Sequence, residues 1–71
     1  MHLFYTPDIN GNTHVLGEKE SKHAIKVLRL KKGEVVILID GAGGWYEAVI
    51  HDENPRACLL RINSHTENYH P

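Results

Sequence analysis

The sequence predicts a small, mostly β domain with one α-helix, closed as a β-barrel of about five short strands. Three observations lead to this fold class. The chain has 71 residues, which is enough for one small domain. Residues 18–30 repeat apolar side chains with the period of a helix. The remaining residues form short β-branched and aromatic runs separated by Gly, Pro and Asn, and closing so short a sheet would remove its exposed edges.

The first elements are expected to be two short strands joined by a turn. The segment HLFYT, residues 2–6, favours a strand that ends at Pro7. Residues 8–12 contain an Asn-Gly pair, which is typical of a turn with positive φ. A brief second strand is expected at residues 13–16.

The helix is expected from Glu18 to Leu30. At about 100° per residue, its apolar side chains fall on one face. These side chains are Ala24, Ile25, Val27 and Leu28. Basic residues follow at the end of the segment, and Gly33 is expected to stop it as an αL cap.

The second half predicts a three-stranded antiparallel meander. Its strands are expected at Glu34–Asp40, Trp45–Asp52 and Ala57–Ile62, with Gly41–Gly44 as the first hairpin connection. Periodicity assigns six residues to the core. They are Val27, Leu28, Ile37, Ile39, Val49 and Leu59.

The last residues differ in composition from the rest of the chain. Residues 63–71 (NSHTENYHP) are polar and follow neither the helical nor the strand period. We therefore expect a domain at residues 1–62 and the start of a linker at 63–71. On this interpretation the chain is the N-terminal piece of a longer protein.

Charge is the strongest functional signal in the sequence. The formal net charge is only −1, so no overall positive field indicates a polyanion partner. Residues 18–33, however, hold six of the eight basic residues against two acidic ones, which is +4. Such a cluster could bind phosphates or simply form a solvated helix face, and the charges alone do not decide between these interpretations.

Other chemistries receive little support. The six histidines lack metal-ligand spacing, so no metal is expected. Cys58 lies within an apolar run and is interpreted as a buried hydrophobe, not a nucleophile. The loop Gly41–Gly44 lacks the Lys-Ser/Thr of a P-loop and joins two strands, so we expect a turn and not a phosphate site. Trp45 and Tyr46 could stack on bases, but one core ring and one half-exposed ring is the simpler interpretation.

No signal peptide or membrane span is visible, and the one cysteine has no partner for an internal disulfide. A cytoplasmic location is therefore expected.

Particular motifs carry a resemblance to a known family. Residues 23–33 (HAIKVLRLKKG) are followed, after a strand, by Asp40-Gly and Trp45-Tyr46. Together with the opening His2-Leu-Phe-Tyr, this pattern resembles the N-terminal domain of the RsmE family, although the arginine usual in that opening is absent. These proteins are ribosomal RNA small-subunit (16S) uracil-N3 methyltransferases. The resemblance covers roughly residues 1–62.

The resemblance implies a PUA-like β-barrel that holds ribosomal RNA of the small subunit. It also implies a C-terminal SPOUT domain, outside these 71 residues, that binds S-adenosylmethionine, forms the homodimer and transfers the methyl group. The chain itself is then expected to be catalytically inert and to hold no cofactor.

His23 and Arg29 match the family's helix motif and become candidate RNA contacts. Charge placement adds Lys22, Lys26, Lys31 and Lys32. The alternative is a small β-barrel that mediates protein–protein contact without RNA binding.

Overall fold

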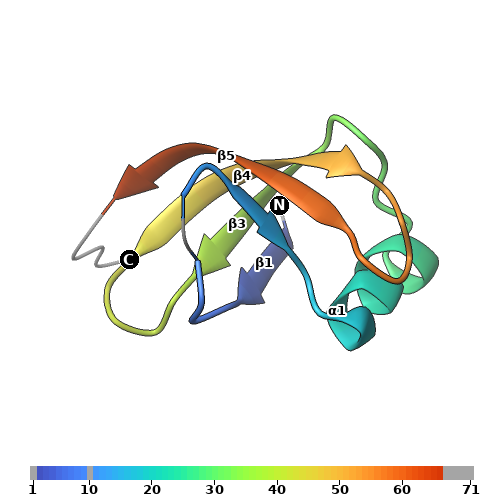
Figure 1. Cartoon of the computed structure of the whole chain (residues 1–71), viewed down its shortest axis with the longest axis horizontal. Helices are drawn as coiled ribbons and strands as arrows, with labels where there is room; N and C mark the ends of the chain where they lie inside the picture. Colours follow the sequence, from blue (N-terminus) through green and yellow to red (C-terminus); the bar gives the residue numbers. More distant parts are fainter. Residues whose placement is uncertain (1, 10, 67–71) are drawn as a thin grey trace.

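The computed structural model of the chain describes residues 2–9 and 11–66. This part of the chain forms five strands and one continuous helical segment (Figure 1). The strands are β1 (His2–Tyr5), β2 (Thr13–Val15), β3 (Val35–Ile39), β4 (Trp45–Asp52) and β5 (Leu59–Thr66). The helical segment begins as an α-helix, α1 (Glu18–Lys22), and continues as a π-helix, η1 (His23–Val27). The predicted fold class, mostly β with one helix, is confirmed.

The strands form one sheet in the order β1-β3-β4-β5-β2. β3, β4 and β5 pair antiparallel, as the predicted meander requires. β1 joins β3 in parallel, and β2 joins β5 antiparallel. The helical segment lies against one side of the curved sheet, near one end (Figure 1). We call this side the inner face and the opposite side the open face.

Backbone pairing does not close the sheet into the expected barrel. Within residues 2–9 and 11–66, β1 and β2 are the two edges and do not pair with each other. With four and three residues, they offer few backbone groups for a further ladder. A hydrogen bond between side chains connects the two edges instead. Thr6, directly after β1, has its Oγ1 2.7 Å from Nε2 of His14 in β2.

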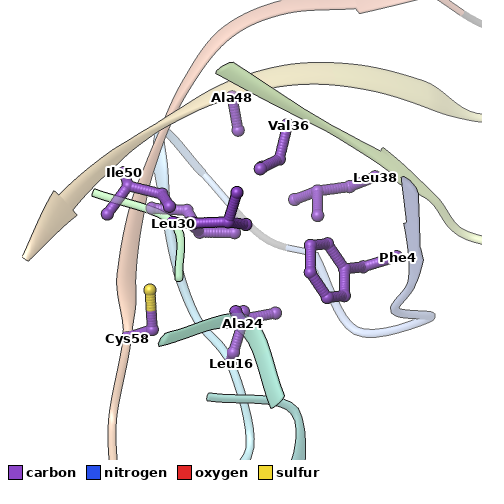
Figure 2. Close-up of a cluster of buried hydrophobic side chains, with 10 residues drawn as sticks. Phe4, Leu16, Ala24, Leu30, Val36, Leu38, Ala48, Ile50 and Cys58 are labelled. Carbon is purple, nitrogen blue, oxygen red and sulfur yellow. The ribbon is translucent and has the colours of Figure 1, made fainter. Parts of the chain in front are cut away.

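The core lies between the inner face and the helical segment. Figure 2 shows side chains from the strands converging on Ala24 of η1 and on Leu30. The buried cluster consists of Phe4, Leu16, Ala24, Leu30, Val36, Leu38, Ala48, Ile50, Cys58 and Leu60. Ile25 and Leu28 pack against it from the helix side.

The structure confirms only part of the core that the sequence predicts. Leu28 does pack against the core, and Ile37 is buried. The strand register nevertheless places four of the six on the open face, alternating with the inner-face residues: Ile37, Ile39, Val49 and Leu59. β3 is apolar at all five positions, so its sequence does not distinguish the faces, and a one-residue change exchanges them.

The helix is shorter than expected, and Val27 is 64% exposed instead of buried. The helical segment ends at Val27, not at Leu30, and Gly33 lies in the turn before β3. The π-helical hydrogen bonds of η1 widen the turn, so a period of about 100° per residue no longer gives the buried face. β5 also continues to Thr66, past the expected end at Ile62. Residues 67–71 of the expected linker lie outside the described residues, so the domain boundary stays a prediction.

Candidate nucleic-acid interface

The six residues predicted to contact RNA are all exposed. They are Lys22, His23, Lys26, Arg29, Lys31 and Lys32. The first three belong to the helical segment, Arg29 follows it, and the last two lie between the helix and β3. Lys19 of α1 is also exposed. We call residues 19–32 the cationic segment, and its contact with RNA stays a prediction.

The backbone of this segment has two unusual features. The Leu28 amide donates to the carbonyl of His23, and the Leu30 amide donates to the carbonyl of Ala24, at 2.9 and 3.0 Å. Between these amides, Arg29 has a φ of 56°, a left-handed conformation that costs an L-residue about 1–2 kcal/mol. This reversal allows Leu30 to enter the core while Arg29 stays exposed. π-helical turns and strained backbone both concentrate at functional sites.

An apolar groove of about 380 Å³ lies beside the cationic segment. Its lining comes from β1, α1 and η1. The lining residues are Phe4, Lys19, Glu20, Lys22, His23 and Val27. The groove therefore brings together two predicted site residues, Lys22 and His23, with Lys19.

A buried serine fixes the helical segment to the sheet. The Ser21 hydroxyl donates to the carbonyl of Leu16 at 2.9 Å and accepts from the amide of Cys58 at 2.8 Å. Ser21 is fully buried, while its neighbours Glu20 and Lys22 are half-buried and exposed. This anchor sets which side of α1 faces solvent, the side on which Lys19 and Lys22 are exposed.

The glycine loop after β3 is a hairpin turn, as predicted. One carboxylate oxygen of Asp40 accepts the amides of Ala42 and Gly44 at 2.8 and 2.9 Å. These two hydrogen bonds lower the pKa of Asp40 below its ordinary value of 3.8, and the one from Ala42 has the larger effect. Gly41 and Gly43 have φ values of 81° and 90°, which suit glycine. Because the chain's own carboxylate already binds these amides, the loop is poorly suited to cradle a phosphate.

The two adjacent aromatic residues of β4 have different surroundings. Tyr46 packs against the core, and its ring stacks on His65 with centroids 4.2 Å apart. Its hydroxyl donates to Asp40 at 3.3 Å. Trp45 is half-buried on the open face. A base stacking on Tyr46 would have to compete with the His65 ring. The structure therefore favours the interpretation of Tyr46 as a core ring.

Cys58 is fully buried, as expected. Burial is the main cause that raises the pKa of its thiol, with Asp52 and Glu53 adding to it. Such a thiol is unsuited to act as a nucleophile. Among the described residues, no three His, Cys, Asp or Glu side chains are arranged to hold a metal ion. No helix within the described part of the chain is long and apolar enough to span a bilayer.

Sequence reasoning missed the residues that complete the groove. Lys19 belongs to the cluster of basic residues but is not among the predicted site residues, although it lies three residues before Lys22 on the same helix. Phe4 comes from β1 and Val27 was assigned to the core. No sequence spacing links Phe4 to the helix, because that contact depends on the tertiary fold.

The chain matches the family model of the RNA methyltransferase PUA domain over residues 16–63. Several solved structures share the fold, and three of them are similar along almost the whole of this chain. A protein from Porphyromonas gingivalis assigned as an rRNA methyltransferase is 31% identical, with a TM-score of 0.83 over 94% of this chain. A methyltransferase from Legionella pneumophila in complex with S-adenosylmethionine is 27% identical, with a TM-score of 0.83 over 92%. The ribosomal RNA small subunit methyltransferase E from Neisseria gonorrhoeae, bound to S-adenosylmethionine, is 24% identical, with a TM-score of 0.82 over 93%.

The chain spans only 28% of each of these longer proteins. A comparison with curated protein sequences finds no match. The family match covers most of the chain and agrees with the motif that begins at His23. This chain therefore belongs to the RNA methyltransferase PUA domain family and is a domain of the kind found in RsmE-like rRNA methyltransferases.

Proposed function

We propose that this domain holds small-subunit ribosomal RNA for methylation of 16S rRNA at N3 of uracil. The observation that carries the proposal is the cationic segment, in which every basic side chain is exposed. Ammonium and guanidinium groups gathered in this way bind phosphates without reading sequence. The domain then positions the RNA, and the reaction takes place elsewhere in the whole protein.

The chemistry of the proposed target supports this division. N3 of uracil lies on the Watson–Crick edge, so the base must be unpaired when it reacts. A separate domain that binds the surrounding phosphates can hold the RNA while the base enters a catalytic site. We assign that site, and the homodimer contact, to a C-terminal SPOUT domain of a cytoplasmic protein, as the resemblance to the RsmE family implies.

The proposal places S-adenosylmethionine outside this chain, and two features of the chain support that assignment. The loop rich in glycine joins two strands, and its Ala42 and Gly44 amides already donate to Asp40. The lining of the groove beside the helix includes two lysines, Lys19 and Lys22, which would repel a sulfonium. We therefore assign the methyl donor to the C-terminal domain, which would supply the methyl group to the bound RNA.

Fluorescence anisotropy with a short single-stranded rRNA oligonucleotide over a salt series tests the proposal. About four or five phosphate contacts predict a log–log slope near −3 to −4, at roughly −0.7 per contact. Lys26→Gln and Arg29→Gln should each weaken binding and flatten the slope by about 0.7. Arg61→Gln removes an exposed charge from the open face and serves as the matched control. Affinity that does not change with salt would contradict RNA binding by this segment.

A protein-contact function is the second candidate, because the open face favours it. Leu3 and Tyr5 of β1 are 57% and 56% exposed, and Val35 of β3 is also exposed. Together they form an apolar surface of the kind that marks interaction sites. If the chain fails to bind RNA in the salt series, this face becomes the leading candidate for its function.

A further inference from the structure

The groove between β1 and the helical segment combines two kinds of surface. Phe4 and Val27 give it apolar walls. Lys19 and Lys22 lie on the same groove from α1, three residues apart, and His23 follows them. An apolar pocket with cations on its rim suits a ligand that has a flat, weakly polar part and an anionic part.

Val27 is the clearest sign that this groove is not ordinary core. It is 64% exposed, more than any other large hydrophobic residue among those described. The neighbouring apolar residues of η1 and its C-cap, Ile25 and Leu28, pack against the core. The wide π-helical turn therefore presents one apolar side chain beside the lysines instead of burying it.

We propose that the groove binds one unpaired nucleobase of RNA, with the base against Phe4 and Val27 and its flanking phosphate near Lys19 and Lys22. This inference rests on the proposed function and adds a base site to the phosphate contacts. Unpaired bases of single-stranded RNA pack on aromatic and apolar side chains while cations bind the backbone. The volume of about 380 Å³ is at the small end of ligand pockets, which suits a single base.

The charges on the groove favour a nucleotide over an apolar peptide. An apolar peptide side chain would gain nothing from the two lysines on the rim. Glu20, half-buried on the same groove, repels phosphate, so the backbone of the RNA should pass on the side of the lysines. A nucleotide satisfies both the apolar walls and the cationic rim.

A mutant cycle between protein and RNA tests the base site. The experiment compares the affinity for an intact single-stranded oligonucleotide with the affinity for a series of strands of the same sequence at constant salt. Each strand in the series has one abasic position, at a different place. The parent chain should bind the intact strand about tenfold more tightly than the strand that is abasic at the bound position. Val27→Ser should lose a measurable part of this factor with intact RNA, since Phe4 remains, and almost nothing with that abasic strand. Val15→Ser makes the same change at an exposed valine of β2 and should have no effect.

The salt slope separates failure of the base site from failure of the proposed function. If RNA binds with a steep salt slope but abasic and intact strands bind alike, the base site is wrong and phosphate binding stands. If RNA does not bind at all, both proposals fail. In a direct test, uridine 5′-monophosphate should shift the methyl NMR signals of Val27. Shifts with N-acetyl-leucine amide, and none with the nucleotide, would assign the groove to a peptide and overturn the inference.

Discussion

The inner and open faces of the sheet are similar in sequence but differ in structure. β3 places Val36 and Leu38 on the inner face, where both are fully buried, and Val35 on the open face, where it is 38% exposed. The helical segment covers the inner face, and it also carries the exposed lysines Lys19, Lys22 and Lys26. Apolar composition therefore does not locate the core in this domain. The position of the helical segment decides which face of the sheet it covers, although Ile37 on the open face is buried as well.

Truncating one residue on each face tests this difference most strongly. Leu38→Ala should lower the free energy of unfolding by about 2–5 kcal/mol, because it leaves a cavity in the core. Val35→Ala should cost no more than about 0.5–1 kcal/mol, since its side chain is already partly in solvent. Urea unfolding measures both. Equal losses would show that the open face is as tightly packed as the inner face.

The buried hydroxyl that anchors the helix gives the next largest effect. Ser21→Ala should lower the free energy of unfolding by about 1–3 kcal/mol, because the amide of Cys58 and the carbonyl of Leu16 lose a partner inside the core. Ser64→Ala, at an exposed open-face position of β5, should change it by less than about 0.5 kcal/mol. If the Ser21 variant is as stable as the parent chain, the Ser21 hydroxyl does not anchor the helical segment.

A substitution at Arg29, which has a strained backbone, should affect stability and RNA binding in different ways. Arg29→Gly relieves the left-handed strain of about 1–2 kcal/mol but adds about 0.5–1 kcal/mol of backbone entropy cost. The unfolding free energy should therefore stay level or rise, by up to about 1.5 kcal/mol, while RNA affinity falls. Lys32→Gly removes a charge at a residue without positive φ and should lower stability. If both variants lose stability equally, the backbone at Arg29 is not strained.

The hairpin loop belongs to neither face and should show the smallest effect. The amides of Ala42 and Gly44 lower the pKa of Asp40 below 3.8. Its contribution to stability is therefore present above the ordinary pKa and is lost as the pH falls through the lowered value. A carboxyl NMR titration should give a pKa below 3.8 for Asp40, and Asp40→Asn should remove this part of the acid dependence. A pKa at or above 3.8 would mean that the loop amides do not bind the carboxylate.

The sequence was sufficient to locate the strands and the helix, but not to predict which face of the sheet the helix covers. Turn residues and β-branched runs located all five strands, and charge clustering located the cationic segment. The face of β3 was not readable from its five apolar residues, but its neighbours carried a usable signal. Glu47 alternates with Ala48 and Ile50, and Arg61 lies next to Leu60, so the charged positions indicate the open face.

The features of the site that sequence reasoning missed depend on the tertiary fold. The π-helical turn ends the helix before Leu30 and exposes Val27, and no side-chain period indicates such a turn. The groove needs Phe4 from β1, which is distant in sequence from Lys19 and Lys22. The anchor from Ser21 to Cys58 likewise joins residues 37 positions apart.

An amide NMR map of the chain with a single-stranded rRNA oligonucleotide tests most directly whether RNA binds the helix side. At low salt, the largest shifts should fall within residues 19–32, with small shifts at the open-face positions Leu3, Val35 and Arg61. Adding salt should reverse them, because phosphate contacts weaken with ionic strength. Largest shifts on the open face, or shifts that persist unchanged in high salt, would contradict the account.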